Sequence, residues 1–288
     1  MQIVNEVQIM HRLNSPHIMK FHDWYETKNN LWLILEYCTC GDLQSLLKQD
    51  GHLPELSVRM FALDIISGLK VCVTHFPACG HLIQRYVSLQ YLHMLGYVHC
   101  DLRPCNILID EYGILKIADF KLTKKIPKSP LGSTPLSSRG TPLYMAPELF
   151  SAEGTHSFAS DFWSLGCVMF ELRMGGRPFS CRWWRGEEGG EAEGRMAEVV
   201  DNIRSKELSA IIQQMILQKN GKWSETGASG SGTSSTLLTK GSRGGSSGSS
   251  TTREETAGSG NYVPSMSRDL FDLVSWMLEK VPHHRCDW

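Results

Sequence analysis

The sequence predicts an α+β fold in which a small β-containing region precedes a mainly helical remainder. Two β-rich runs, "HIMKFHDWYE" and "NNLWLILEY", lie within the first 37 residues and are separated by a Lys-Asn-Asn turn. Later segments have apolar residues at helical spacing, and "FASDFWSLGCVMFEL" is apolar nearly all round, which is typical of a buried helix. A chain of 288 residues is long enough for one large domain or two smaller ones with ample core.

The first element is expected to be an amphipathic helix. In "MQIVNEVQIMHRL", Ile3, Val7 and Met10 fall on one helical face. Glu6 lies where a secretion signal would need an apolar core, so the segment does not predict export.

Two helices are expected after the strands. Gly41-Asp42 precedes the short run "LQSLLKQ", and Pro54 begins a longer run. This longer run has apolar residues at helical spacing: Val58, Phe61, Ile65 and Leu69.

The segment 70–89 would break the longer helix, because Pro77 and Gly80 disfavour helical structure. If residues 70–89 are removed, Leu92 and Leu95 continue the apolar stripe. We therefore predict one helix interrupted by an insertion, such as translated intron. A genuine surface loop is the alternative.

The remaining chain predicts a hairpin and further helices. "NILIDEYGILKIADF" has two apolar runs around Asp110-Glu111-Tyr112-Gly113, a turn of suitable length for a β-hairpin. Residues 205–218 and "SRDLFDLVSWMLEK" are expected to be helical. Residues 224–260 are dominated by Ser, Gly and Thr, so we expect a disordered insert within a domain.

Composition restricts the class of protein. A formal net charge of −1 argues against broad electrostatic binding of nucleic acid or anionic lipid. No apolar run approaches the ~20 residues of a membrane span. The nine cysteines include no C-x-x-C pair, so free thiols in a reducing, cytoplasmic compartment are expected. His283, His284 and Cys286 are interpreted as a solvated tail rather than a metal site.

Four motifs point to a family. "HCDLRPCNILI", "ADF", "GTPLYMAPE" and "DFWSLGC" occur in this order over residues 99–167, and together they resemble the C-lobe of eukaryotic protein kinases. "HDWYET", "LEYCTCGDL" and "HSFASDFWSLGCV" are similar to the Fused and Unc-51-like branch, especially its microtubule-associated animal members and plant Runkel-like members. The resemblance covers residues 1–180 and 265–286.

The resemblance implies a bilobal kinase fold. Residues 1–37 would form a partial N-lobe, consisting of its helix and two of its strands. Residues 38–288 would form a mainly α-helical C-lobe that carries the inserts at 70–89 and 224–260.

The resemblance also implies a phosphoryl-transfer site that uses ATP and Mg²⁺. Asp101 would accept or orient the substrate hydroxyl, and Asn106 would hold a second Mg²⁺. Asp119 would bridge Mg²⁺ to the nucleotide phosphates. Arg103 stands where Ser/Thr kinases usually have Lys, and would contact the transferred phosphoryl. The structural alternatives are a turn residue for Asp101 and a loop cap for Asn106.

The segment Glu36-Tyr37-Cys38 resembles the hinge whose backbone receives adenine, although it is equally well explained as a strand end. By the same resemblance His99 is a packing residue and Asp161 anchors the catalytic loop, residues 99–106. Glu148 and Arg285 would form a buried, stabilising ion pair. Thr141 would help to hold the substrate site and favours a serine or threonine hydroxyl.

The sequence departs from the family pattern at several positions. Cys100 replaces an Arg that pairs with an activation-loop phosphate, and Lys121 replaces the Gly of Asp-Phe-Gly. The chain contains no glycine-rich phosphate loop and no following nucleotide-binding Lys, so Glu6 is expected to lack its family partner. This suggests either a truncated gene model or a degenerate kinase.

Three functions therefore stay open at this point. The first is a Ser/Thr kinase domain that transfers the γ-phosphoryl of ATP to a protein substrate, with weak turnover in this chain. The second is a pseudokinase scaffold that binds partners, including microtubules, without turnover. The third is a non-functional gene fragment. No nucleic-acid or membrane partner is expected.

Overall fold

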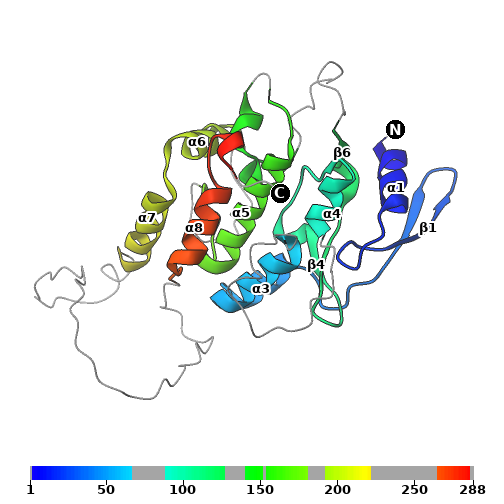
Figure 1. The fold of residues 1–288 in the computed structure, drawn as a ribbon, viewed down its shortest axis with the longest axis horizontal. Coiled ribbons are helices and arrows are strands. Elements are labelled where there is room, and N and C mark those ends of the chain that lie inside the picture. The colour runs from blue at the N-terminus through cyan, green and yellow to red at the C-terminus, as the bar shows by residue number, and fades with distance from the viewer. Residues whose placement is uncertain are drawn as a thin grey trace, which may run out of the picture.

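The N-terminal part of the molecule consists of one helix and a β-hairpin. The computed structural model describes residues 2–66, 88–126, 140–151, 154–180, 192–221 and 265–285. Helix α1 (Gln2–Arg12) precedes the antiparallel strands β1 (Phe21–Glu26) and β2 (Leu31–Leu35), as the sequence predicts. Figure 1 shows this part at one end of the molecule, far from helices α6 and α7.

The rest of the described chain is mainly helical. Its helices are α2 (Leu43–Asp50), α3 (Glu55–Ile66), α4 (Ser88–Met94), α5 (Phe158–Met174), α6 (Ala192–Ser205), α7 (Leu208–Gly221) and α8 (Arg268–Met277). Two short antiparallel pairs of strands accompany them. Strand β3 (Tyr97–Val98) pairs with β6 (Lys124–Lys125), and β4 (Ile107–Ile109) pairs with β5 (Leu115–Ile117).

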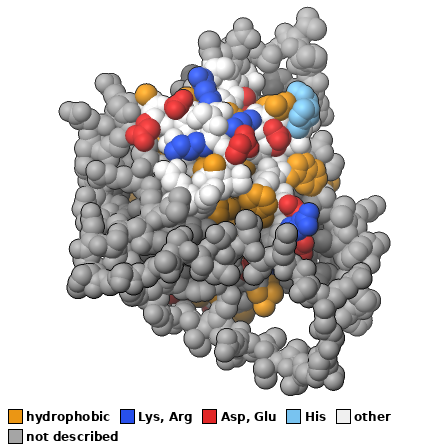
Figure 2. Space-filling view, turned by 90° about the vertical axis from the view of Figure 1, so that its left-hand side faces the viewer, with side chains coloured by type: hydrophobic (Ala, Val, Ile, Leu, Met, Phe, Trp, Pro, Cys, Tyr) orange, Lys and Arg blue, Asp and Glu red, His pale blue; other side chains and the backbone are white. Residues whose placement is uncertain are grey.

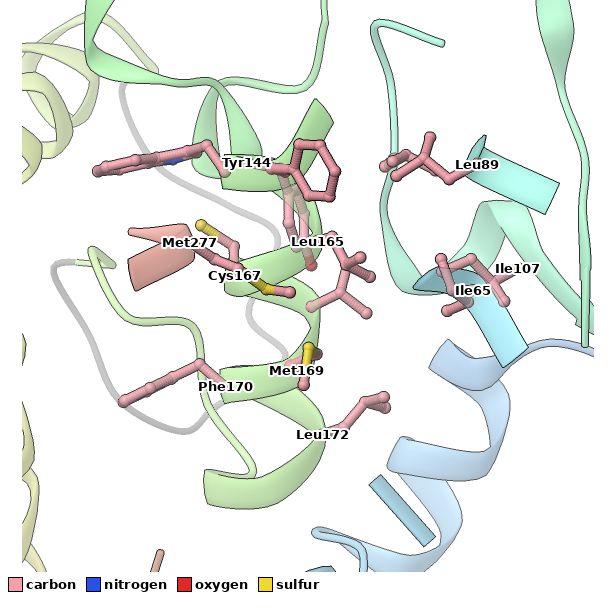
Figure 3. Close-up of a cluster of buried hydrophobic side chains, with 14 of the residues drawn as sticks. Ile65, Leu89, Ile107, Tyr144, Leu165, Cys167, Met169, Phe170, Leu172 and Met277 are labelled. Carbon is pink, nitrogen blue, oxygen red and sulfur yellow. The ribbon is translucent and has the colours of Figure 1, made fainter. Parts of the chain in front are cut away.

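Helix α5 is the centre of the core, in agreement with its apolar sequence. Every residue from Ser160 to Met174 is buried, and the helix packs against α3 and α8. Figure 3 shows its side chains leaving on two sides, with Phe170 and Leu172 pointing in opposite directions. Gly166 allows the close approach of α8, because a Cβ there would lie 2.8 Å from the Cβ of Met277.

The β4–β5 hairpin forms at the predicted turn. The Oδ1 atom of Asp110 accepts hydrogen bonds from the backbone N–H groups of Tyr112 and Ile114, each at 2.9 Å. Gly113 adopts a φ of 76°, which a residue without a Cβ tolerates at low cost. Ile107 pairs with Ile117, so the hairpin presents its open end to the catalytic loop.

The predicted insertion at 70–89 lies mostly outside the described residues. Helix α3 ends at Ile66, and α4 begins at Ser88. The last residue of the predicted insertion, Leu89, is fully buried in α4. Leu92 is buried as expected, but Leu95 follows the end of α4 and is 40% exposed, so it does not continue the apolar stripe. The predicted disordered insert, 224–260, is also outside the described residues.

The last features of the fold are the apolar character of its helices and the distribution of charge on its surface. Among the described residues, no helix combines the length and the apolar character needed to span a bilayer. Figure 2 shows acidic and basic side chains interspersed on the described part of one face.

Candidate active site

The catalytic loop is anchored from beneath by α5. Asp161 accepts the backbone N–H of His99 at 2.8 Å on Oδ2 and that of Cys100 at 3.0 Å on Oδ1. Its Oδ2 is also 2.8 Å from Nε2 of His93. Burial raises the pKa of Asp161, but the bonds from His93 and His99 outweigh it and leave the pKa below its usual 3.8. The predicted anchoring role of Asp161 is therefore confirmed.

The anchor holds the loop in a backbone conformation that non-glycine residues rarely adopt. Cys100 has a φ of 69°, in the left-handed region. His99 is fully buried, its Nε2 lies 3.0 Å from the carbonyl oxygen of Ala118, and its ring meets that of Phe120 edge-on. These contacts agree with the expected packing role of His99.

The carboxylate of Asp101 is held on both oxygens. Its Oδ1 accepts the hydroxyl of Thr141 at 2.7 Å and the Thr141 backbone N–H at 3.0 Å. Its Oδ2 accepts Nδ2 of Asn106 at 3.2 Å, and Nε of Arg103 lies 3.6 Å away. The Asp101 side chain stays 12% exposed, so it is oriented while a face remains open to solvent.

The hairpin places Asn106 and Asp119 at one end of two paired strands. The carbonyl oxygen of Asn106 accepts the N–H of Ala118 at 2.9 Å, and Asp119 is the next residue. Nδ2 of Asn106 also donates to the Asp101 carbonyl at 2.9 Å. Asp119 has a φ of 62°, a second left-handed non-glycine residue in the site. The structure thus brings Asp101, Arg103 and Asn106 into contact and places Asp119 beside them through the hairpin.

The oxygen atoms at this end of the hairpin are suitable ligands for Mg²⁺. The Oδ1 atom of Asp119 is buried and makes no hydrogen bond to the described residues. The Asn106 side chain supplies an amide oxygen, which accepts a hydrogen bond from the thiol of Cys105 at 3.5 Å. A carboxylate and an amide oxygen are the hard ligands that Mg²⁺ prefers. Asp119 and Asn106 therefore fit the ion.

The hinge candidates lie on a separate segment that follows β2. The Glu36 carboxylate is used structurally, since its Oε1 is 2.8 Å from Nζ of Lys116 and its Oε2 accepts the backbone N–H of Lys20 at 3.0 Å. Its backbone N–H donates to the carbonyl oxygen of Lys20 at 2.9 Å, so the carbonyl oxygen is the backbone atom of Glu36 that could meet a ligand. Cys38 is buried, which raises the pKa of its thiol. Beyond it, the N–H of Cys40 donates to the carbonyl oxygen of Ile109 at 3.2 Å, which links this segment to β4.

Two charged or polar residues of the site region were not identified from the sequence. Lys116 is a buried lysine on β5 that pairs with Glu36 and lies 3.7 Å from Oδ2 of Asp110. A lysine inside the apolar run "ILKIADF" was a usable signal, because a buried charge requires a partner. His93 gave no such signal, since its partner Asp161 is 68 residues away.

The predicted ion pair between Glu148 and Arg285 is present. The two terminal guanidinium nitrogens of Arg285, Nη1 and Nη2, donate to the Glu148 carboxylate at 2.9 and 3.0 Å. The Arg285 side chain is fully buried and also donates to the carbonyl oxygen of Ala159 at the start of α5. This bidentate ion pair holds the segment that follows Thr141 against the last described residues of the chain.

Comparison with known proteins matches this arrangement to one family. The family model described as protein tyrosine and serine/threonine kinase matches residues 1–214. The chain is 47% identical over 184 residues to serine/threonine-protein kinase RUNKEL of Arabidopsis thaliana, covering 63% of the chain and 12% of that protein. It is 35% identical over 200 residues to serine/threonine-protein kinase ULK4 of Mus musculus, covering 62% of the chain and 14% of that protein.

The chain therefore spans only about one eighth of the length of these relatives. The family match covers well over half of the chain and includes the catalytic loop, the hairpin and α5. By this match and the geometry of its site, the chain belongs to the protein tyrosine and serine/threonine kinase family.

Proposed function

We propose that this chain is a serine/threonine protein kinase domain that transfers the γ-phosphoryl group of ATP to a hydroxyl of a protein substrate. The observation that supports this most directly is the Asp101 carboxylate. It is oriented by Thr141 and Asn106 and remains partly open to solvent. A carboxylate held in this way is suited to receive a proton from an incoming hydroxyl.

In the proposed reaction the oxygen of the substrate hydroxyl forms a bond to the γ-phosphorus of ATP. The bond from that phosphorus to the bridging oxygen breaks, and ADP leaves with the electron pair. The hydroxyl proton passes to the Asp101 carboxylate. Arg103, with Nε 3.6 Å from Oδ2 of Asp101, supplies a positive charge beside the transferred group.

The proposed nucleotide site uses two segments of the chain. The backbone of residues 36–38 would receive adenine, and Asn106 and Asp119 would hold Mg²⁺. When bound, this ion neutralises charge on the phosphates. Binding of ATP at this place is supported by the segment 38–41, which pairs with β4 three residues beyond Asn106.

The direct test is the substitution Asp101→Asn, assayed by phosphate transfer from radiolabelled ATP to a generic protein substrate. We expect the rate to fall about a hundredfold to ten-thousandfold, the usual contribution of a positioned acid–base group. Asp201→Asn is the matched control, because it makes the same change at an exposed position of α6. Equal rates for the Asp101→Asn variant and the unmodified chain would contradict the proposal.

A scaffold without turnover is the second candidate, and it is favoured by Lys121. Nζ of Lys121 lies 3.5 Å from Oδ1 of Asp119, the carboxylate that would hold Mg²⁺. ATP binding by the unmodified chain with no phosphate transfer, unchanged by Asp101→Asn, would support the scaffold. Association with microtubules belongs to this candidate and rests on the family resemblance alone. Co-sedimentation with polymerised tubulin tests it.

The proposed domain organisation and location complete this assignment. We assign residues 1–37 to a partial N-lobe and residues 38–288 to the C-lobe, with inserts at 70–89 and 224–260. The partner is a protein that carries serine or threonine hydroxyls, and the expected location is the cytoplasm.

A further inference from the structure

Lys121 forms an ion pair with the Asp119 carboxylate at the open end of the β4–β5 hairpin. It belongs to the 3₁₀ turn η3 (Phe120–Leu122), which packs against α1. Its Nζ is 3.5 Å from Oδ1 of Asp119. Glu6 of α1 is 5% exposed, and its carboxylate lies within the electrostatic influence of both Lys121 and Asp119.

The position of Lys121 is set by its neighbours. Phe120 is fully buried, and its ring lies 5.4 Å from the ring of His99. The Lys121 side chain is 67% exposed, and its ammonium group lies 3.5 Å from Oδ1 of Asp119. The turn is anchored by one buried residue, Phe120, and its exposed lysine presents one positive charge to a carboxylate oxygen that makes no hydrogen bond to the described residues.

We infer that Lys121 is a fixed cation of the site, which supplies part of the charge neutralisation that a divalent ion would otherwise provide at Asp119. This inference deepens the proposed function, since it concerns how the proposed nucleotide site balances its charge. It does not require turnover.

The physical reason is competition for one oxygen. An ammonium group 3.5 Å from Oδ1 of Asp119 repels any divalent ion that approaches the same atom. The carboxylates of Glu6 and Asp119 also repel each other, and Lys121 offsets this repulsion without a metal. Divalent ions should therefore bind more weakly here than they would beside a neutral residue, and ATP binding should depend less on them.

The deciding experiment measures the affinity of the chain for Mn²⁺, used as a probe for Mg²⁺, in the absence of nucleotide. Free Mn²⁺ is titrated with the unmodified chain and with Lys121→Met, Asp119→Asn and Lys28→Met, and is followed by its paramagnetic resonance signal. Lys28→Met is the matched control, because it removes the same charge from the exposed turn between β1 and β2. Circular dichroism of each variant verifies that it is folded.

We expect Lys121→Met to bind Mn²⁺ about fivefold to tenfold more tightly than the unmodified chain, a range that allows for solvent screening of an exposed lysine. Lys28→Met should bind as the unmodified chain does, and Asp119→Asn should bind more weakly. Equal affinity of Lys121→Met and the unmodified chain, including undetectable binding by both, overturns the inference.

A second arm separates this inference from the proposed function. Binding of a fluorescent ATP analogue is measured with Mg²⁺ and with EDTA. The unmodified chain should lose less affinity in EDTA than Lys121→Met does, and an equal loss overturns the inference. If no variant binds the analogue under either condition, the proposed kinase function fails, and the Mn²⁺ titration alone decides the role of Lys121.

Discussion

Replacement of Asp161 by Asn tests whether α5 sets the geometry of the catalytic loop. The carboxylate is 1% exposed and accepts the two backbone N–H groups of His99 and Cys100 on different oxygens. Asn keeps the shape of the side chain but has only one oxygen. Its amide group must face one of the N–H donors, which leaves that donor buried and unpaired.

The expected cost follows from these contacts. An unpaired buried N–H costs about 1–3 kcal/mol, and hydrogen bonds to a charged acceptor are worth about 1 kcal/mol more than neutral ones. We therefore expect Asp161→Asn to lower the free energy of unfolding by about 3 kcal/mol. This is a large share of the roughly 5–15 kcal/mol that holds a typical domain together.

The measurement is urea unfolding of the Asp161→Asn variant, monitored by far-ultraviolet circular dichroism. The midpoint should move to lower urea while the slope of the transition is retained. Asp201→Asn on α6 is the control and should change stability by less than about 0.5 kcal/mol. Coincident midpoints for the two variants would refute the anchoring argument.

Three further predictions concern the packing of the helical part. Arg285→Met should lower the free energy of unfolding by about 3–5 kcal/mol, because it leaves the Glu148 carboxylate without its buried partner. A double-mutant cycle with Glu148→Gln, followed by urea unfolding, measures the coupling between the two residues, and additive effects would contradict the prediction. Gly166→Ala should cost about 1–3 kcal/mol in thermal unfolding, since its Cβ would lie 2.8 Å from that of Met277, and an unchanged midpoint would mean that α8 moves freely. Burial raises the pKa of Glu55, but hydrogen bonds from the start of α8 outweigh it and bring the pKa below 4.5. The ionised carboxylate therefore stabilises the fold above pH 4.5, and this contribution is lost as the pH falls through the lower pKa of the folded state. Glu55→Gln should weaken the dependence of the free energy of unfolding on pH in this acid range, as measured by urea unfolding at a series of pH values.

Local patterns predicted much of the fold. The turn at Asp110 was recognised because a short polar group separates two apolar runs, and the hairpin forms there. Helix α5 was recognised because its residues are apolar all round. Helix α3 was identified from apolar spacing, but Leu95 was wrongly included in its stripe because a repeat does not show where a helix stops.

The contacts between distant residues were predictable only through family resemblance. The pair of Glu148 with Arg285 and the anchor at Asp161 were expected for that reason, and both are present. His93 was missed because its partner Asp161 lies far away in the sequence and no local period connects them. Lys116 was missed although its place within an apolar run indicated a buried charge; its partner Glu36 could not be identified from that run. The Asp101, Asn106 and Asp119 roles remain predictions, although the structure gathers these residues at one end of a hairpin.

The tie between Lys116 and Glu36 bears on movement between the two parts of the molecule. The N-terminal part is attached to β5 a second time, because the N–H of Met19 donates to the carbonyl oxygen of Ile117 at 2.9 Å. A rotation of one part against the other cannot pivot on the connecting segment, residues 36–42, alone, because it must also break this second attachment. Rotation of the N-terminal part relative to the helical part should therefore be restricted.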